Sequence, residues 1–163
     1  MNRPYTAEQY EAMVDRIRTK LPNAAISCDI IAGFPGETDE EFAESRALCE
    51  RVGFSRMHVF RYSARPGTPA ATAPGQVAPE VMAARSSELR HVAESTSQVD
   101  ARARIGARET AVLEFGNRGT LGSFHRVIVD DAGTDRTGQL VRVKITGMDD
   151  RGLLHASMGE SDL

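Results

Sequence analysis

Two apolar segments, each ending in a glycine- and proline-rich corner, constrain the fold of this chain more than any other feature. The first leads into Gly33-Phe-Pro-Gly-Glu-Thr38, and the second leads into Tyr62-Ser-Ala-Arg-Pro-Gly-Thr-Pro69. Apolar runs of this kind are typical of buried parallel strands. In α/β proteins, ligands bind at the carboxyl ends of such strands, where these corners lie. We therefore predict an α/β fold with its first candidate site at the two corners.

Helix signals stand on both sides of the first apolar segment. Thr6 has the character of an N-cap and precedes a helical pattern over residues 7–20. Thr38 opens a capping box, Thr-Asp-Glu-Glu, and Gly53 suits the end of the helix that follows. Two helices are therefore expected, one before the first corner and one after it.

The apolar segments themselves predict strands over residues 24–32 and 54–62. The first is almost continuous in apolar residues, as in a strand covered on both faces. In the second, Met57, Val59 and Phe60 are expected to face the core. A helix between two such strands makes a β-α-β unit, in which the strands are parallel.

A loop rich in proline, glycine, alanine and threonine follows over residues 64–79. Beyond it, a helix is predicted from residue 79 to residue 105, with Val81, Leu89 and Val92 as its apolar anchors.

The chain changes character after Gly106. Apolar stretches separated by glycine and aspartate turns predict short strands over residues 110–115, 126–129, 140–146 and 153–156. Short strands at this spacing are typical of a small barrel or sandwich. We place a domain boundary near residue 105, which divides the chain into domains 1–105 and 106–163.

Composition excludes several functional classes. The net charge is −3, and residues 106–163 hold seven Arg and Lys against nine Asp and Glu, so positive charge is not in general excess. No stretch reaches the roughly 18 apolar residues of a transmembrane helix, and residues 1–6 lack the apolar core of a signal peptide. We expect a cytoplasmic protein with no membrane partner. Cys28 and Cys49 stand in no metal-binding spacing and are interpreted as buried apolar thiols.

The two corners, in this order, resemble the last two barrel strands of the tRNA methylthiotransferases, which are radical S-adenosylmethionine enzymes. Residues 33–38 match the corner after the fifth strand of that family, and residues 62–68 match the corner after the sixth. In the tail, Gly122 with residues 126–129, together with residues 138–147, resembles the TRAM domain, a small β-barrel that holds tRNA. The resemblance implies part of a TIM-like radical-SAM barrel followed by a TRAM barrel.

The resemblance also implies a cofactor site at the first corner. In the family this strand end lies beside the adenosyl part of S-adenosylmethionine, and the matching residues are Ile31, Gly33, Phe34, Pro35, Gly36, Glu37 and Tyr62. The residues alone leave a second interpretation open, in which the corner only shapes a turn and caps the next helix. Glu37 would then hold the loop instead of accepting hydrogen bonds from a ligand.

The family binds two 4Fe-4S clusters as well, but this chain contains no C-x-x-x-C-x-x-C motif. We therefore expect neither metal ligands nor catalytic residues here, and no activity of the chain by itself. Two parallel strands alone leave an unpaired edge and an uncovered apolar face. Residues 1–105 are accordingly predicted to need a complementary N-terminal chain or a second copy.

Basic residues suggest a tRNA contact at the anticodon stem-loop. Arg61 and Arg65 bracket the end of the second strand, in a stretch from residue 51 to residue 79 without acidic residues. Guanidinium groups suit phosphate, although a solvated face or pairing with Glu37 or Glu50 explains them equally well. In the tail, the candidates for an RNA-binding barrel face are Arg118, Phe124, His125, Arg126, Arg142 and Lys144. Phe115 is expected in the barrel core.

Two other functions remain open. The chain can be a noncatalytic RNA-binding or scaffold protein, or a fragment of the sister family that modifies a ribosomal protein. His58, in Met57-His-Val-Phe60, resembles the branch that acts on threonylcarbamoyladenosine, not the isopentenyladenosine branch.

Overall fold

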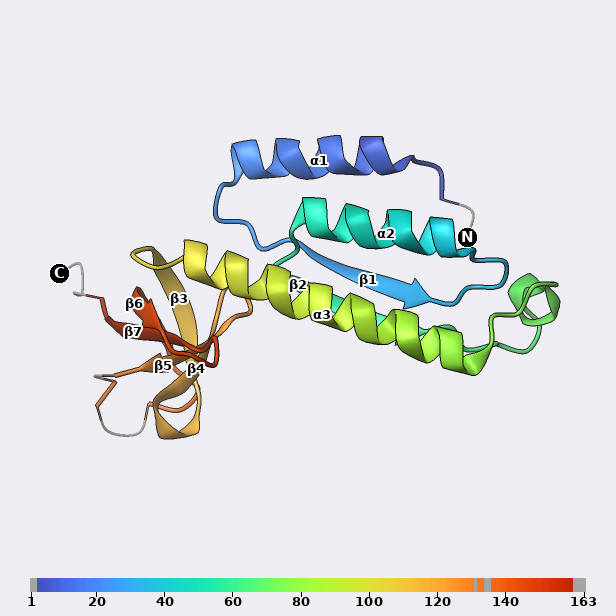
Figure 1. Ribbon diagram of the computed structural model, residues 1–163. Coiled ribbons are helices and arrows are strands. Elements are labelled where there is room, and N and C mark those ends of the chain that lie inside the picture. The colour runs from blue at the N-terminus through green and yellow to red at the C-terminus, as the bar shows by residue number, and fades with distance from the viewer. Residues whose placement is uncertain (1–2, 131, 134–135, 160–163) are drawn as a thin grey trace. The chain divides into compact units, whose positions relative to one another are not determined.

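The computed structural model describes residues 3–130, 132–133 and 136–159 (Figure 1). The chain forms two compact units, Met1–Ser97 and Gln98–Leu163, which divide within the helix α3, Pro79–Ala103. Each unit has an apolar core of its own, and the domain boundary near residue 105 stays a prediction. Among the described residues, no helix is long and apolar enough to cross a membrane.

The N-terminal unit contains the predicted β-α-β unit preceded by a helix. Its elements are α1, Ala7–Lys20; β1, Ser27–Ala32; α2, Asp39–Val52; and β2, Arg56–Arg61. The two strands are parallel and pair along their full length. A short 3-10 helix, η1, Pro69–Thr72, lies in the loop before α3.

Local signals start and end these helices where the sequence predicts. The Thr6 side chain accepts a hydrogen bond from the backbone N–H of Gln9, and the Thr6 backbone N–H donates to the Gln9 side-chain oxygen, which completes a capping box. Thr38 and Glu41 form the same arrangement at the start of α2. Gly53 ends α2 with φ of 60°, a conformation that glycine adopts without steric cost.

The helices cover one face of the two-stranded sheet. Buried residues of α1, α2 and α3 pack against alternate residues of the strands, in a core formed by Val14, Ala32, Phe42, Cys49, Val52, Phe54, Met57, Leu89 and Val92. On the other face, every second residue of β1 is exposed. The prediction of a strand covered on both faces is therefore wrong for the described chain, because nothing in it packs on this second face.

Two predicted core residues are also exposed. Phe60 is 51% exposed, because Val59 faces the helices and successive side chains of a strand point to opposite faces. Val81 is 37% exposed although it lies on the same side of α3 as Arg85, Leu89 and Val92, because it stands in the first turn, before the part of the helix that joins the core. The strands are shorter than predicted, since their pairing starts at Ser27 opposite Arg56.

The C-terminal unit is a closed five-stranded barrel. Its elements are β3, Arg108–Leu113; the 3-10 helix η2, Phe115–Asn117; β4, Arg118–Leu121; β5, Arg126–Val129; β6, Leu140–Met148; and β7, Leu154–Met158. The strand order around the barrel is β3-β4-β5-β7-β6, with β5 and β7 parallel and the other pairs antiparallel. The small barrel is thus confirmed.

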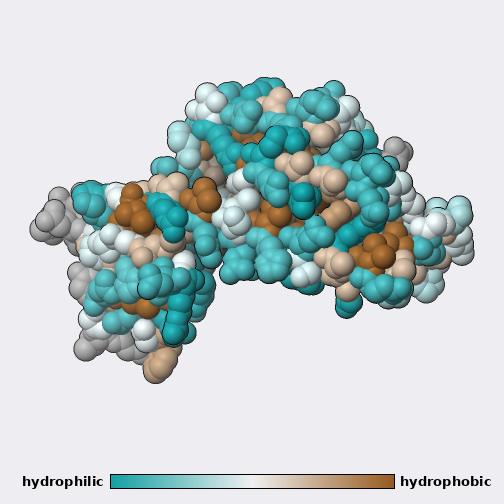
Figure 2. All heavy atoms as spheres, viewed as in Figure 1, coloured by the Kyte–Doolittle hydropathy of each residue, from teal (hydrophilic) through white to brown (hydrophobic). Residues whose placement is uncertain are grey.

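Alternate residues of the strands fill the barrel, including Leu113, Val127, Val129, Val143, Ile145 and Leu154. The sequence did not predict β4, and it placed Phe115 in the core. Phe115 is instead 87% exposed, because β3 ends at Leu113 and the chain turns at Gly116, where φ is 72°. Hydrophilic residues cover most of the face of each unit that is visible in Figure 2.

Candidate functional site

The corner after β1 is closely packed. Gly33 is buried with φ of 77°, and a Cβ atom built there would lie 2.1 Å from Cγ of Met82 on α3. The Gly36 amide donates to the carbonyl of Gly75, 2.8 Å away, in the loop before α3. Only glycine combines this backbone conformation with so close an approach at position 33.

Two hollows lie at this corner. One, of about 440 Å³, is lined by Ile31 and Phe34 to Glu37 from the corner and by residues of α2. The other, of about 520 Å³, lies at the ends of both strands and is lined by Ile31, Phe34 and Tyr62 with Arg61 and Arg65. Both volumes fall in the range of small-molecule sites.

The predicted cofactor residues are thus brought together, with one exception. Six of them line one hollow or the other, whereas Gly33 lines neither and packs beneath Met82. The rings of Phe34 and Tyr62 meet edge to face at 5.4 Å between centroids. The hydroxyl oxygen of Tyr62 is buried and has no hydrogen-bond partner among the described residues.

Charged side chains of both signs surround the second hollow. Arg61 and Arg65 line it, as expected from their place at the end of β2. Its two other charged residues, Arg3 and Asp29, were not predicted from the sequence. Asp29 lies opposite His58 in the strand pair, on the exposed face of the sheet. The hollow therefore offers cations, a carboxylate and the three aromatic rings of Phe34, Phe60 and Tyr62 within one opening.

Glu37 holds the loop. Its Oε2 atom accepts the backbone N–H of Gly33, in a short hydrogen bond, and that of Phe34 at 3.1 Å. The side chain is 13% exposed. Of the two roles that the residues alone left open for Glu37, the geometry favours the anchor within the corner.

The two cysteines are apolar core thiols. Burial raises the pKa of Cys28 to about 12 and that of Cys49 to about 11, so both stay protonated at neutral pH. Among the described residues, no group of three or more His, Cys, Asp or Glu side chains is placed to hold a metal ion. A thiol kept protonated is a poor ligand, since metals bind the thiolate.

On the barrel, strand register brings Arg142 and Lys144 together with Arg108, which was not predicted from the sequence. Lys144 lies opposite Arg108, and Arg142 lies opposite Thr110, on the outer face of the β3–β6 pair. We call Arg108, Arg142 and Lys144 the β3–β6 basic face. Arg108 was missed because only the register of β3 against β6 places it there.

Other predicted RNA-binding residues lie elsewhere on the barrel. Arg126 donates to both carboxylate oxygens of Glu114, at 2.6 and 2.7 Å, so its charge is partly balanced. Arg118 is exposed on β4. Phe124 is 61% exposed in the turn between β4 and β5, with φ of 67°, which a residue other than glycine rarely adopts.

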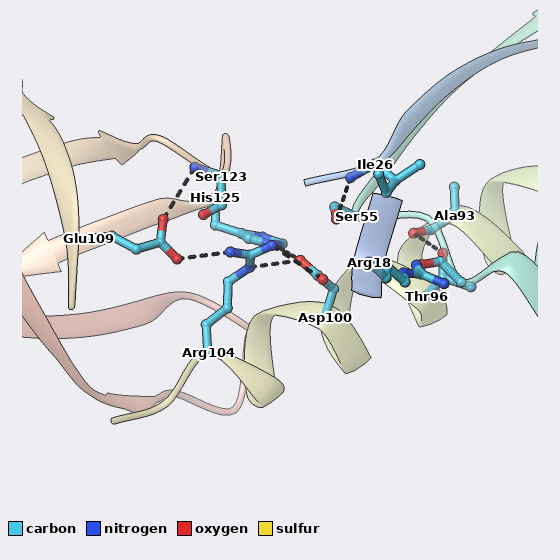
Figure 3. Close-up of polar contacts among 11 residues, drawn as sticks. Arg18, Ile26, Ser55, Ala93, Thr96, Asp100, Arg104, Glu109, Ser123 and His125 are labelled. Carbon is cyan, nitrogen blue, oxygen red and sulfur yellow. Dashed lines mark hydrogen bonds and ion pairs between the residues drawn. The ribbon is translucent and has the colours of Figure 1, made fainter. Parts of the chain in front are cut away.

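His125 instead contacts a buried ion-pair cluster (Figure 3). Its Nε2 atom lies 2.7 Å from Asp100, which also accepts two hydrogen bonds from Arg104. Arg104 donates to Glu109 at 2.9 Å, and Glu109 accepts the backbone N–H of Ser123. His125 and Arg104 are 10% and 8% exposed, so this cluster ties α3 to the barrel within the C-terminal unit.

The cluster makes the barrel sensitive to acid. Burial alone would raise the pKa of Asp100, but hydrogen bonds from His125 and Arg104 outweigh it and lower the pKa to about 2. In the unfolded chain this pKa is about 3.9. The stability that Asp100 contributes is therefore fully present above about pH 4 and is lost as the pH falls toward 2.

We expect the barrel to lose roughly 2 kcal/mol over that interval from this one group. The measurement is urea unfolding of the whole chain at several pH values, followed by NMR signals of β6 and β7. Comparison with Asp100→Asn isolates this group from the other carboxylates. Equal acid sensitivity of the two proteins would contradict the assignment.

Comparison with known proteins finds one enzyme name repeatedly. A protein of Thermobifida fusca named tRNA-2-methylthio-N(6)-dimethylallyladenosine synthase is 38% identical over 159 residues, which cover 90% of this chain and 32% of that protein. A synthase of the same name from Cereibacter sphaeroides is 40% identical over 152 residues, covering 90% of this chain and 34% of that protein. One from Mycolicibacterium gilvum is 44% identical over 113 residues, covering 69% and 22%.

The chain thus spans about a third or less of the length of these relatives. No family model matches it. The relatives are named for dimethylallyladenosine, so their name does not support the threonylcarbamoyladenosine branch that the segment around His58 suggested.

Proposed function

We propose that this chain is the C-terminal part of a tRNA methylthiotransferase that acts on dimethylallyladenosine beside the anticodon. The observation that carries the proposal is the similarity of 90% of the chain to synthases of that name. The closed five-stranded barrel supports it, because a TRAM-like barrel is what the tail resembles. The radical-SAM half-barrel belongs to the same proposal and is supported by the parallel β1–β2 pair with helices on one face.

The corner residues fit S-adenosylmethionine as far as this chain contributes to its site. When bound, the cofactor supplies the adenosyl and methyl groups of the reaction. Phe34 and Tyr62 offer apolar ring surface for its adenosyl part, and the buried Tyr62 hydroxyl is an available donor. Arg61 or Arg65 can pair with its carboxylate, and Asp29 with its ammonium. These groups bind and orient the cofactor, and the backbone at Gly36 lets it approach closely.

The described residues do not fit an iron–sulfur cluster, since the two thiols are core groups with raised pKa values. No iron-dependent step is assigned to this chain, which we expect to be inactive by itself. The exposed face and the free edges of the β1–β2 pair suit the preceding strands of a longer protein. A separate N-terminal chain or a second copy would meet the same need.

The tRNA contact is assigned to the β3–β6 basic face. It presents three cations on the outer face of two adjacent strands, and contacts of cations with phosphates supply much of the affinity for RNA. The exposed Phe124 offers a ring on which a base can stack. Arg118, Arg126 and His125 are further candidates on the barrel that lie outside the β3–β6 pair. Arg61 and Arg65 are separate candidates for RNA contact in the N-terminal unit.

The test is the affinity of the whole chain for a fluorescent anticodon stem-loop RNA at low salt. In the triple variant Arg108→Gln, Arg142→Gln and Lys144→Gln, we expect affinity to fall about tenfold or more, and the slope of log K against log salt to fall by about 2. The matched control removes three exposed charges from helices, Arg16→Gln, Lys20→Gln and Arg90→Gln.

Two outcomes contradict the proposal. If the control weakens binding as much as the triple variant, attraction is general and the assigned face is wrong. If the wild-type chain does not bind the stem-loop at all, the proposal that the tail binds tRNA is rejected, and the branch that modifies a ribosomal protein is favoured. A noncatalytic RNA-binding role predicts a different pair of results. The chain would bind the stem-loop, but adding the N-terminal part of a relative would not restore methylthiolation of tRNA.

A further inference from the structure

The carboxylate of Glu37 fixes the backbone of the corner from Gly33 to Glu37. Glu37 accepts the N–H groups of Gly33 and Phe34, and its own N–H donates to the Phe34 carbonyl at 2.9 Å. These contacts orient the segment that lines both hollows. The corner therefore depends on how the Glu37 side chain is held.

Arg85 holds the other side of Glu37. Its guanidinium donates to the Glu37 backbone carbonyl at 3.0 Å and lies 3.6 Å from the Glu37 carboxylate. It also donates to Asp39, in the first turn of α2, at 2.7 Å and lies over the ring of Phe42 at 5.3 Å. The Arg85 side chain is only 7% exposed. A buried cation thus joins α3 to the end of the corner and to the start of the next helix.

We propose that Arg85 is a positioning residue for the corner from Gly33 to Glu37. It touches no surface of either hollow and acts through Glu37, whose charge it balances away from water. The planar guanidinium serves several acceptors at fixed angles, which an ammonium group cannot do. This inference rests on the proposed function, because the corner matters only if a ligand lies against it.

The test measures backbone protection in the whole chain by NMR-detected hydrogen exchange. In Arg85→Met we expect the amides of Gly33 and Phe34 to exchange at least about tenfold faster, while amides of β6 in the barrel keep their rates. In Arg85→Lys, which keeps the charge but not the geometry, we expect an intermediate increase at the same two amides. The matched control is Arg90→Met, an exposed arginine of the same helix, which should change neither.

A second measurement separates positioning from general stability. Glu37→Gln should accelerate the same two amides, and the double variant with Arg85→Met should add little, because both act through one contact. If Arg85→Met instead accelerates α1, α2, β1 and β2 evenly, or leaves Gly33 and Phe34 unchanged, the proposal is overturned. Should Arg85→Met not fold, the Arg85→Lys result alone decides between these outcomes.

The RNA measurement is independent of this one. Arg85 lies outside the barrel unit, so Arg85→Met should bind the anticodon stem-loop as the wild type does. Absence of stem-loop binding by the wild type would therefore reject the tRNA function and leave the exchange result standing. Unchanged exchange with intact RNA binding would reject the role of Arg85 alone.

Discussion

Arg104→Met is expected to lower the free energy of unfolding of the barrel unit by about 3–5 kcal/mol, among the largest losses for a single change in this chain. Arg104 is almost fully buried and donates to Asp100 at 2.8 Å and to Glu109 at 2.9 Å. Methionine keeps much of the side-chain volume but removes the cation. The largely buried carboxylates of Asp100 and Glu109 then lose the arginine that balances their negative charge.

Urea unfolding, followed by NMR signals of β6 and β7, measures this loss without mixing in the N-terminal unit. Arg118→Met, an exposed arginine of the same barrel, serves as the control and should change stability by no more than about 0.5 kcal/mol. The double variant Asp100→Asn with Arg104→Met should recover part of the loss, because one uncompensated charge is gone. A loss below about 1 kcal/mol in Arg104→Met would mean that water screens the carboxylates.

Gly33→Ala is expected to destabilise the N-terminal unit by about 3 kcal/mol. Part of the cost is conformational, since φ is 77° and alanine rarely adopts this region. The rest is steric, because the new Cβ would lie 2.1 Å from Cγ and 2.9 Å from Sδ of Met82. The corner and α3 must separate, and the hydrogen bonds of Glu37 are disturbed with them.

Gly36→Ala separates the two costs. Its φ of 85° carries the same conformational penalty, but a Cβ there would meet nothing within 4 Å, so we expect a loss of only about 1–2 kcal/mol. Adding Met82→Ala to Gly33→Ala should restore some stability by removing the overlapping atoms. The measurement is urea unfolding followed by NMR signals of β1 and α2. Equal losses of stability in Gly33→Ala and Gly36→Ala would show that the overlap of the new Cβ with Met82 adds no cost.

Features that depend on neighbouring residues in the chain could be predicted from the sequence. Both helix starts depend on a threonine and on the side chain three residues later, as the two capping boxes show. The end of α2 depends on Gly53 alone. These signals act over one helical turn, so no knowledge of the tertiary fold is needed to interpret them.

Features that depend on which face of an element is covered could not be predicted in the same way. Phe60 and Val81 are both apolar, yet both are exposed: Phe60 points to the uncovered face of its strand, and Val81 lies in the first turn of α3, before the packed part of the helix. Phe115 follows an apolar strand but lies beyond its last barrel residue. Apolar character predicts that a residue can be buried, whereas the packing of distant elements decides whether it is.

The same distinction between local and long-range features applies to the candidate site. The sequence by itself determined the two corners, their order and four of the five barrel strands of the tail, because turns and strand patterns are local properties. Only the tertiary structure decided that Glu37 anchors its own loop, that Arg85 stands behind it and that His125 joins Asp100. It also placed Arg108 beside Lys144. Such contacts join residues up to 48 positions apart, and their partners are set by strand register and helix packing instead of by neighbours in the chain.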